Sequence, residues 1–170
     1  MRACLYCQSA AGDLPQAVVY EDRHVVAFLD WRQRAPGHVL VIPRRHLDAE
    51  ALFASEVAAP FFRAVARVAR GLRRSLSPDG LQMGAILYPA RGLWRGSGVP
   101  HARWDLDRDR VQEETAEDGH FHLHILPRRS GGEVARIFPY GDEVETPERL
   151  AELAARIREG VLAESLTSDA

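Results

Sequence analysis

The sequence contains no lysine, only two cysteines and no long run of uncharged apolar residues. Arginine alone supplies the 22 basic residues, and 24 acidic residues nearly balance them, which leaves a net charge of −2. A chain without a global basic field is a poor match for nucleic acid or an anionic membrane surface. No apolar run is long enough to span a bilayer, and the first residues do not resemble a signal peptide. We therefore expect a cytoplasmic protein with neither nucleic acid nor a membrane as partner.

Length and composition fit one domain. The chain has 170 residues, of which 46% are apolar, enough for a sizeable core. No internal repeat and no second boundary interrupts it. We expect residues 1–170 to form a single α+β domain.

Local patterns place the main elements. Between residues 17 and 43, β-branched and aromatic residues dominate three segments separated by turn residues, which is typical of an antiparallel meander. Apolar residues recur at spacings of three and four over 56–76, which indicates a helix, and a strand is expected over 81–88. A final helix begins at Thr146-Pro147-Glu148. The three meander strands are expected at Val18–Tyr20, Val25–Asp30 and His38–Pro43.

Three histidines alternate with apolar residues in the run from 120 to 128. In a β-strand successive side chains point to opposite faces, so His120, His122 and His124 share one face. A single histidine on such a strand is usually a packed core residue. Three together are costly to bury unless they serve a metal, an anion or a reaction. Metal binding by all three, as in a cupin-like barrel, is an alternative, but it requires an all-β chain.

Both cysteines lie in the segment Cys4-Leu5-Tyr6-Cys7. In a reducing compartment, two cysteines at this spacing are more often a metal half-site or a redox pair than a structural disulfide. A structural zinc site needs two further ligands from elsewhere in the chain. The alternative is two free thiols packed as small hydrophobic side chains.

The triad run, together with Pro127-Arg128 after it, resembles the signature of the histidine triad (HIT) family. Segments 20–22, 27–30 and 36–43 resemble the nucleotide-binding half of the same family. The resemblance implies an α+β HIT fold, with an antiparallel sheet of about five strands, a long central helix and a C-terminal helix. It also implies a homodimer.

The resemblance also implies the chemistry. A HIT hydrolase or nucleotidyl transferase acts at the α-phosphate of a nucleotide conjugate or dinucleotide polyphosphate, through a covalent nucleotidyl-histidine. The nucleophile falls on His122, and His120 and His124 support it. A neutral imidazole with a fixed tautomer can attack phosphorus in line, so the chemistry allows this assignment.

The resemblance assigns two further groups of residues. Asp30 would bind the ribose hydroxyls, although an ordinary turn or cap residue is the alternative, and His38 would form hydrogen bonds beside the triad or simply pack. Phe28, Leu29 and Trp31 would border the base. A structural zinc, with no catalytic metal required, would take the ligands Cys4, Cys7, His46 and His120.

The segment at about 91–119 departs from the family as an unusual insertion. Seven acidic residues, three arginines and Trp104 lie between His101 and Gly119, and Trp94 precedes them, which favours partial packing over disorder. The asparagine and the small hydroxyl residue that the family places before the triad are missing. Two alternatives follow: a zinc-stabilised nucleotide-binding protein that has lost catalysis, or a HIT enzyme with a remodelled substrate and the insertion as a lid.

Overall fold

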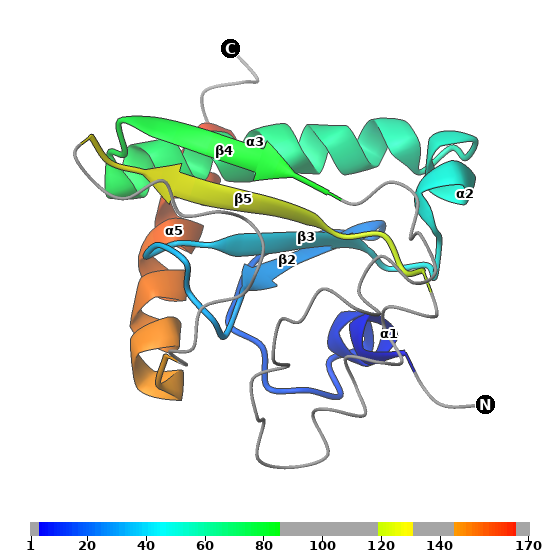
Figure 1. The fold of residues 1–170 in the computed structure, drawn as a ribbon, viewed down its shortest axis with the longest axis horizontal. Coiled ribbons are helices and arrows are strands. Elements are labelled where there is room, and N and C mark those ends of the chain that lie inside the picture. The colour runs from blue at the N-terminus through cyan, green and yellow to red at the C-terminus, as the bar shows by residue number, and fades with distance from the viewer. Residues whose placement is uncertain (1–3, 86–118, 131–144, 166–170) are drawn as a thin grey trace, which may run out of the picture.

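The computed structural model describes residues 4–85, 119–130 and 145–165, and these form an α+β fold built on one five-stranded sheet (Figure 1). The strands are β1 (Val18–Glu21), β2 (Val25–Leu29), β3 (Val39–Pro43), β4 (Gly80–Gly84) and β5 (Leu123–Arg128). The helices are α1 (Leu5–Ala11), α2 (Ala49–Phe53), α3 (Ala58–Leu76) and α5 (Pro147–Ser165). The expectations for the end of the strand at 81–88 and for the insertion up to residue 118 lie outside the described residues.

The sheet is antiparallel throughout, with the strand order β1-β2-β3-β5-β4. The predicted meander over β1, β2 and β3 is confirmed. β5, which carries the end of the triad run, lies between β3 and β4, so Val41 pairs with Leu123 and Leu40 pairs with His124. On the other side of β5, Gly84 pairs with His124.

The strand predicted from His120 begins three residues later, at Leu123. The reason is a different hydrogen-bond partner, because the backbone N–H of Phe121 donates to the carbonyl oxygen of Leu47 (2.7 Å), which lies outside the sheet. The expected division of faces still holds on the apolar side, where one set of side chains joins the main core. That set is Phe121, Leu123 and Ile125.

Two separate cores cover the two faces of the sheet (Figure 1). The main core lies between the sheet and the helices α2, α3 and α5. It buries the predicted apolar stripe of α3, namely Phe61, Val65, Val68 and Leu72. The smaller core lies on the opposite face, where α1 packs on Val26, Phe28, Leu40 and Ile42. The central strands β2 and β3 are therefore buried on both faces.

Helix α5 packs against α3 at two glycines. A Cβ atom added to Gly160 would lie 2.6 Å from the carbonyl oxygen of Gly71, and one added to Gly71 would lie 3.0 Å from the backbone of Val161. The buried side of this helix thus packs in the same chain, with Leu150, Ile157 and Val161 in the main core.

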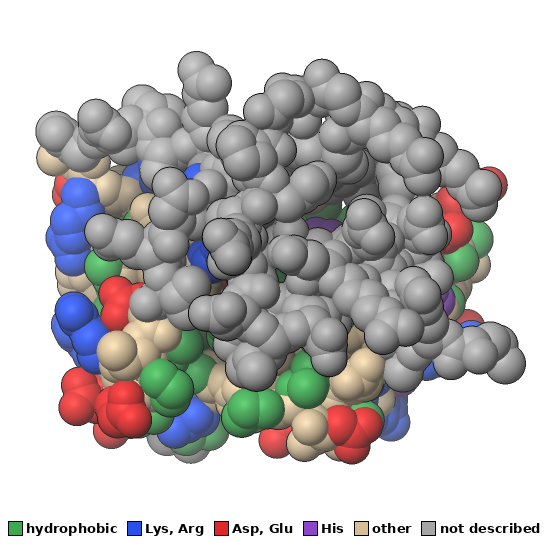
Figure 2. All heavy atoms as spheres, turned by 60° about the horizontal axis from the view of Figure 1, so that its bottom comes forward, with side chains coloured by type: hydrophobic (Ala, Val, Ile, Leu, Met, Phe, Trp, Pro, Cys, Tyr) green, Lys and Arg blue, Asp and Glu red, His purple; other side chains and the backbone are tan. Residues whose placement is uncertain are grey.

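Basic and acidic side chains are interspersed along the left and lower margins of the face shown in Figure 2. This pattern agrees with the near-balance of arginines and acidic residues in the sequence. Across the described part of the chain, none of the helices combines the length and the apolar character that a membrane span requires.

We predict that Gly71→Ala and Gly160→Ala each destabilise the protein by about 1–3 kcal/mol, because the added methyl meets backbone that cannot give way. This penalty exceeds the gain of about 1 kcal/mol that alanine brings to a helix interior. Gly80→Ala is the matched control, since its Cβ would meet no atom within 4 Å. Urea unfolding measures all three, and equal stability of the Gly160→Ala and Gly80→Ala variants would contradict the close contact.

Candidate functional site

The triad histidines gather at the amino-terminal end of β5, on the side of the sheet that α1 covers. His124 stands opposite Leu40 in the ladder, and paired residues of neighbouring strands share a face. Leu40 belongs to the smaller core beneath α1. His120 and His124 are buried, and His122 is half-buried.

A backbone carbonyl favours one tautomer of His122. Its Nδ1 atom lies 3.1 Å from the carbonyl oxygen of His120, a group that can only accept a hydrogen bond. We therefore assign the proton of the neutral ring to Nδ1, which leaves the lone pair on Nε2. A lone pair on a half-buried ring is the arrangement that a nucleophilic histidine needs.

His124 belongs to a second chain of contacts that runs away from the nucleophile. Its Nδ1 lies 2.9 Å from Nε2 of His38. Nδ1 of His38 lies 3.3 Å from the carbonyl oxygen of Arg32 and 3.5 Å from Oδ2 of Asp30. Since both of these oxygens are acceptors, His38 donates from Nδ1 and accepts at Nε2 the proton of His124. Asp30, His38 and His124 thus orient one another.

Burial favours the neutral form of every imidazole in this group. Burial, the largest cause, and the positive charge of neighbouring histidines together lower the pKa of His120 to about 4 and the pKa of His124 to about 2, although the hydrogen bond to the carbonyl oxygen of Pro43 opposes the shift at His120. Burial also lowers the pKa of His122 and the pKa of His38. For Asp30, burial raises the pKa, although the charge of His38 opposes that shift. The histidines are therefore neutral at pH 7, as nucleophiles and metal ligands must be.

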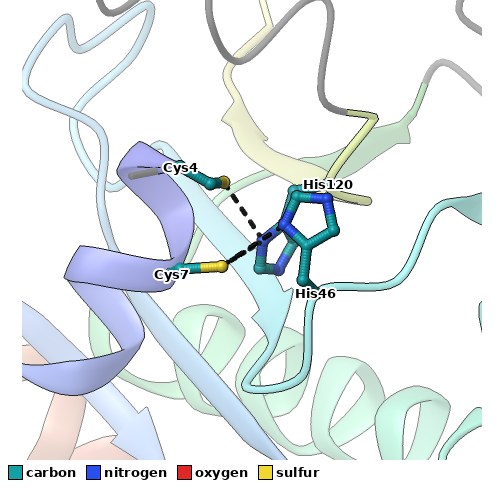
Figure 3. A group of neighbouring side chains, drawn as sticks. All are labelled: Cys4, Cys7, His46 and His120. Carbon is teal, nitrogen blue, oxygen red and sulfur yellow. Dashed lines mark hydrogen bonds between the residues drawn. The ribbon is translucent and has the colours of Figure 1, made fainter. Parts of the chain in front are cut away.

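The four residues expected to hold zinc are brought together (Figure 3). Their ligand atoms all lie within 4.8 Å of one another, and Cys4 and Cys7 point from α1 toward the two imidazoles. Nδ1 of His120 lies 3.5 Å from each sulfur, and Nδ1 of His46 lies 3.3 Å from Sγ of Cys7.

The tautomer of His120 suits metal binding as well. Its Nε2 lies 2.9 Å from the carbonyl oxygen of Pro43, so the proton sits on Nε2 and the lone pair of Nδ1 faces the thiols. Two thiols and two imidazoles are a common donor set for tetrahedral zinc. Cys4 also packs in the smaller core, as the alternative of a small hydrophobic side chain expects, but its sulfur faces His120.

The residues expected to bind a nucleotide do not all reach the histidines. Asp30 and His38 lie beside His124. Oδ1 of Asp30 also accepts from the backbone N–H of Arg32 (2.9 Å), so it is a turn residue as well. Of the other three, Phe28 lies on the face of the sheet that carries His124, because it pairs with Leu40 and Leu40 pairs with His124. Phe28 is buried in the smaller core, Leu29 is fully buried in the main core, and Trp31 is partly buried and donates from Nε1 to Gln16 Oε1 (3.0 Å).

Gln33 fixes the loop between β2 and β3, and the sequence gives no signal for it. Its Nε2 donates to the carbonyl oxygens of Asp30 (2.6 Å) and His38 (3.0 Å). Its Oε1 accepts from the backbone N–H groups of Gly37 (2.7 Å) and His38 (3.0 Å). One amide thus holds both ends of the loop that carries Asp30 and His38.

Tyr6 is a second residue that the sequence patterns leave unmarked. Its ring centroid lies 4.7 Å from that of His122, with the two planes tilted by 32°. The same ring meets His120 in a T-shaped contact at 5.6 Å. Tyr6, one of the two residues between the cysteines, therefore touches both histidines.

Comparison with known proteins places this site in a family. Residues 11–92 match the HIT domain model. Protein hit of Bacillus subtilis is 36% identical over 130 residues, which cover 76% of this chain and 74% of that protein. The crystal structure of a zinc-bound histidine triad family protein from Mycobacterium smegmatis has a TM-score of 0.66 at 24% identity and covers 98% of both chains. The crystal structure of a HIT family hydrolase from Legionella pneumophila has a TM-score of 0.50 at 25% identity and covers 79% of this chain and all of that one. With its fold and its triad in agreement with these relatives, the chain belongs to the histidine triad family.

Proposed function

We propose that the protein is a nucleotide hydrolase or nucleotidyl transferase that acts at the α-phosphate of a nucleotide conjugate or dinucleotide polyphosphate. The observation that supports this function most directly is the hydrogen bond from Nδ1–H of His122 to the carbonyl oxygen of His120, because it leaves the Nε2 lone pair available for attack. The name of the Legionella relative, a HIT family hydrolase, supports the same class of reaction.

The reaction takes two displacements. In the first, the Nε2 lone pair of His122 forms a bond to the α-phosphorus, and the bond from phosphorus to the leaving group breaks with its electron pair on that group. In the second, water or another acceptor attacks the same phosphorus and loses a proton, and the bond from phosphorus to Nε2 breaks. The products are free His122 and, when water is the acceptor, a nucleoside monophosphate. With another acceptor, the nucleotide ends up joined to that acceptor. The burial that lowers the pKa of His122 keeps the ring neutral and able to attack.

The nucleotide contacts extend from the same loop. Asp30 is 9% exposed and would accept hydrogen bonds from the ribose hydroxyls in addition to its contacts with Arg32 and His38. Phe28 and Trp31 would border the base. Leu29, fully buried on the opposite face of β2, would act through the shape of the loop and not by touching the base.

A nucleotide-binding protein without catalysis is the second candidate. The observation that favours it is the sequence before the triad, which has neither the asparagine nor the small hydroxyl residue expected there. Without those groups, fewer donors would stabilise the phosphate oxygens during attack. A stoichiometric burst of leaving group separates the two candidates, since only an enzyme with a covalent intermediate produces one.

We further propose that Cys4, Cys7, His46 and His120 hold a structural zinc. The support is the convergence of the four ligand atoms and the lone pair of His120 Nδ1 on the thiol side. When bound, zinc would tie α1, and the segment between β3 and α2 that carries His46, to His120 just before β5. The proposed nucleophile His122 is not part of this group, and the two displacements proposed here include no catalytic metal.

The same proposal includes a single domain over residues 1–170, with the insertion at about 91–119, and a homodimer. Among the described strands, β4 pairs on one side only, with β5, and its Met83 is 48% exposed. An edge strand with an exposed apolar side chain can pair with a second copy. Sedimentation measures the mass in solution, and a monomer at micromolar concentration would contradict the dimer.

We predict about one equivalent of zinc per chain in protein purified without added metal. At free zinc about a hundred times Kd, binding contributes about 2.7 kcal/mol to stability, a rise of about 5–11 °C in Tm for a chain of this size. Cys7→Ser should lose both the metal and the rise, whereas His24→Ala, which removes a histidine outside the group, should keep them. Less than a tenth of an equivalent, with full folding after chelation, would show that the site is not a zinc site.

We predict that His122→Ala lowers kcat by about a thousandfold or more while nucleotide binding survives, because a nucleophile acts mainly in the transition state. His24→Ala is the matched control and should turn over as the wild type does. Hydrolysis of the substrate that the wild type prefers is the measurement. A loss within about tenfold, or ~1.4 kcal/mol of barrier, would place the nucleophile elsewhere.

A further inference from the structure

Two direct contacts join the metal-ligand group to the nucleophile. The first is the carbonyl oxygen of His120, which accepts from Nδ1 of His122 while the side chain of the same residue faces the thiols. The second is the ring of Tyr6, which lies 4.7 Å from the ring of His122 and belongs to the turn that carries Cys4 and Cys7. His122 is therefore contacted by one member of the metal-ligand group, His120, and by Tyr6, which lies between two other members, Cys4 and Cys7, in the sequence.

Helix α1 depends on outside contacts to keep Tyr6 in place. It has seven residues, too few to be stable as an isolated helix, and the side chain of its N-cap Cys4 makes no capping hydrogen bond. It is held by packing on the smaller core and, at its first turn, by the approach of the two sulfurs to His120 and His46 (Figure 3). A metal bound to both thiols would anchor the turn that carries Tyr6.

The sheet does not determine the orientation of His122. The β5 ladder begins at Leu123 on the β3 side and reaches only His124 on the β4 side. The χ2 torsion of an imidazole is broad, so a ring without lateral contacts can turn over, which places Cδ2 where Nδ1 stood and Cε1 where Nε2 stood. In this structure two rings flank His122: that of His124 lies edge-on with its centroid 5.2 Å away, and that of Tyr6, itself only 8% exposed, lies 4.7 Å away at an interplanar angle of 32°. Of the two, only Tyr6 belongs to the turn that carries Cys4 and Cys7, so its restriction of the rotation of His122 is the one that a bound metal would strengthen.

We propose that Tyr6 is a positioning residue through which metal bound by Cys4, Cys7, His46 and His120 holds the His122 ring with Nε2 toward the reacting phosphorus. The statement that the ring faces a reacting phosphorus rests on the function proposed above. The statement that Tyr6 and the metal hold the ring in one orientation does not. Tyr6 would touch neither the leaving group nor the phosphate. It acts by excluding the flipped ring, in which Cε1 would take the place of Nε2 and Nδ1 would lose its hydrogen bond to the carbonyl oxygen of His120.

The decisive measurement is the ¹⁵N NMR spectrum of the His122 imidazole, compared with and without zinc. Zinc-loaded wild type should show a single neutral tautomer with the proton on Nδ1, and removal of zinc should give averaged signals from both ring nitrogens. This comparison requires no substrate and no variant. The NMR comparison therefore tests the position of the ring even if the protein turns over none of the nucleotide conjugates. Failure to turn them over would count against the proposed function and not against the role of Tyr6.

Three variants separate the ring from the rest of the helix. Tyr6→Leu, with zinc content verified, should show averaged His122 signals despite bound metal and, on a working substrate, about a tenfold lower kcat at unchanged KM, since misplacement by about an ångström has large effects on rate. Tyr6→Phe should restore the wild-type spectrum because the contact is made by the ring. Leu5→Ala, in the same helix turn, is the matched control and should resemble the wild type.

The proposal is overturned by either of two results. One is a single Nδ1–H tautomer at His122 in zinc-loaded Tyr6→Leu. The other is a wild-type His122 spectrum that does not change when zinc is removed from folded protein. If Tyr6→Leu does not fold, the wild-type comparison alone decides.

Discussion

His120 connects the two halves of this site through a single residue. Its Nε2–H donates to the carbonyl oxygen of Pro43, which turns its Nδ1 lone pair toward Cys4 and Cys7. Its own carbonyl oxygen accepts the Nδ1 proton of His122. Each of these hydrogen bonds selects one nitrogen of an imidazole as the lone-pair atom, so two tautomers are set by two carbonyl groups. If His120 were displaced, the metal ligand set and the orientation of the nucleophile would both change.

The histidines are kept neutral by the same burial that forms the sheet. Central strands buried on both faces leave no water to stabilise a charge on His38, His120 or His124, and their pKa values are lowered accordingly. Neutral rings are costly to bury unless their N–H groups are satisfied. The carbonyl groups of Arg32, Pro43 and His120 provide acceptors for this purpose. Desolvation and hydrogen bonding therefore act together to produce rings that can bind metal or attack phosphorus.

Much of the fold could be predicted from local patterns, because alternation and helical spacing report burial directly. The meander, α3, α5 and the apolar face of the triad run follow from them, and the resemblance supplied His46 as the fourth member of the metal group. Alternation also predicts that Phe28 and Leu29, neighbours in one strand, face opposite sides of the sheet, and the two side chains do belong to different cores.

What the sequence could not provide depends on tertiary contacts. The four hydrogen bonds of Gln33 exist only once the ends of a loop meet, and the contact of Tyr6 with His122 joins residues 116 positions apart. The start of β5 at Leu123 depends on Leu47, which draws the backbone of Phe121 away from the ladder. No periodicity in the chain reports such partners.

The sheet order has a consequence for how this protein is made. Of the five strands that the structure describes, β5 comes last in the sequence, yet it lies between β3 and β4, so β4 has no neighbour among them until β5 arrives. When only the first hundred residues have left the ribosome, the chain can form the three-stranded meander, but β4 has no partner strand. The backbone groups of β3 and β4 that later pair with β5 are then unpaired strand edges. The segment that closes these edges is the one that brings the histidines. A nascent chain thus acquires its complete sheet and its reactive residues in the same event, and an unfinished chain has neither.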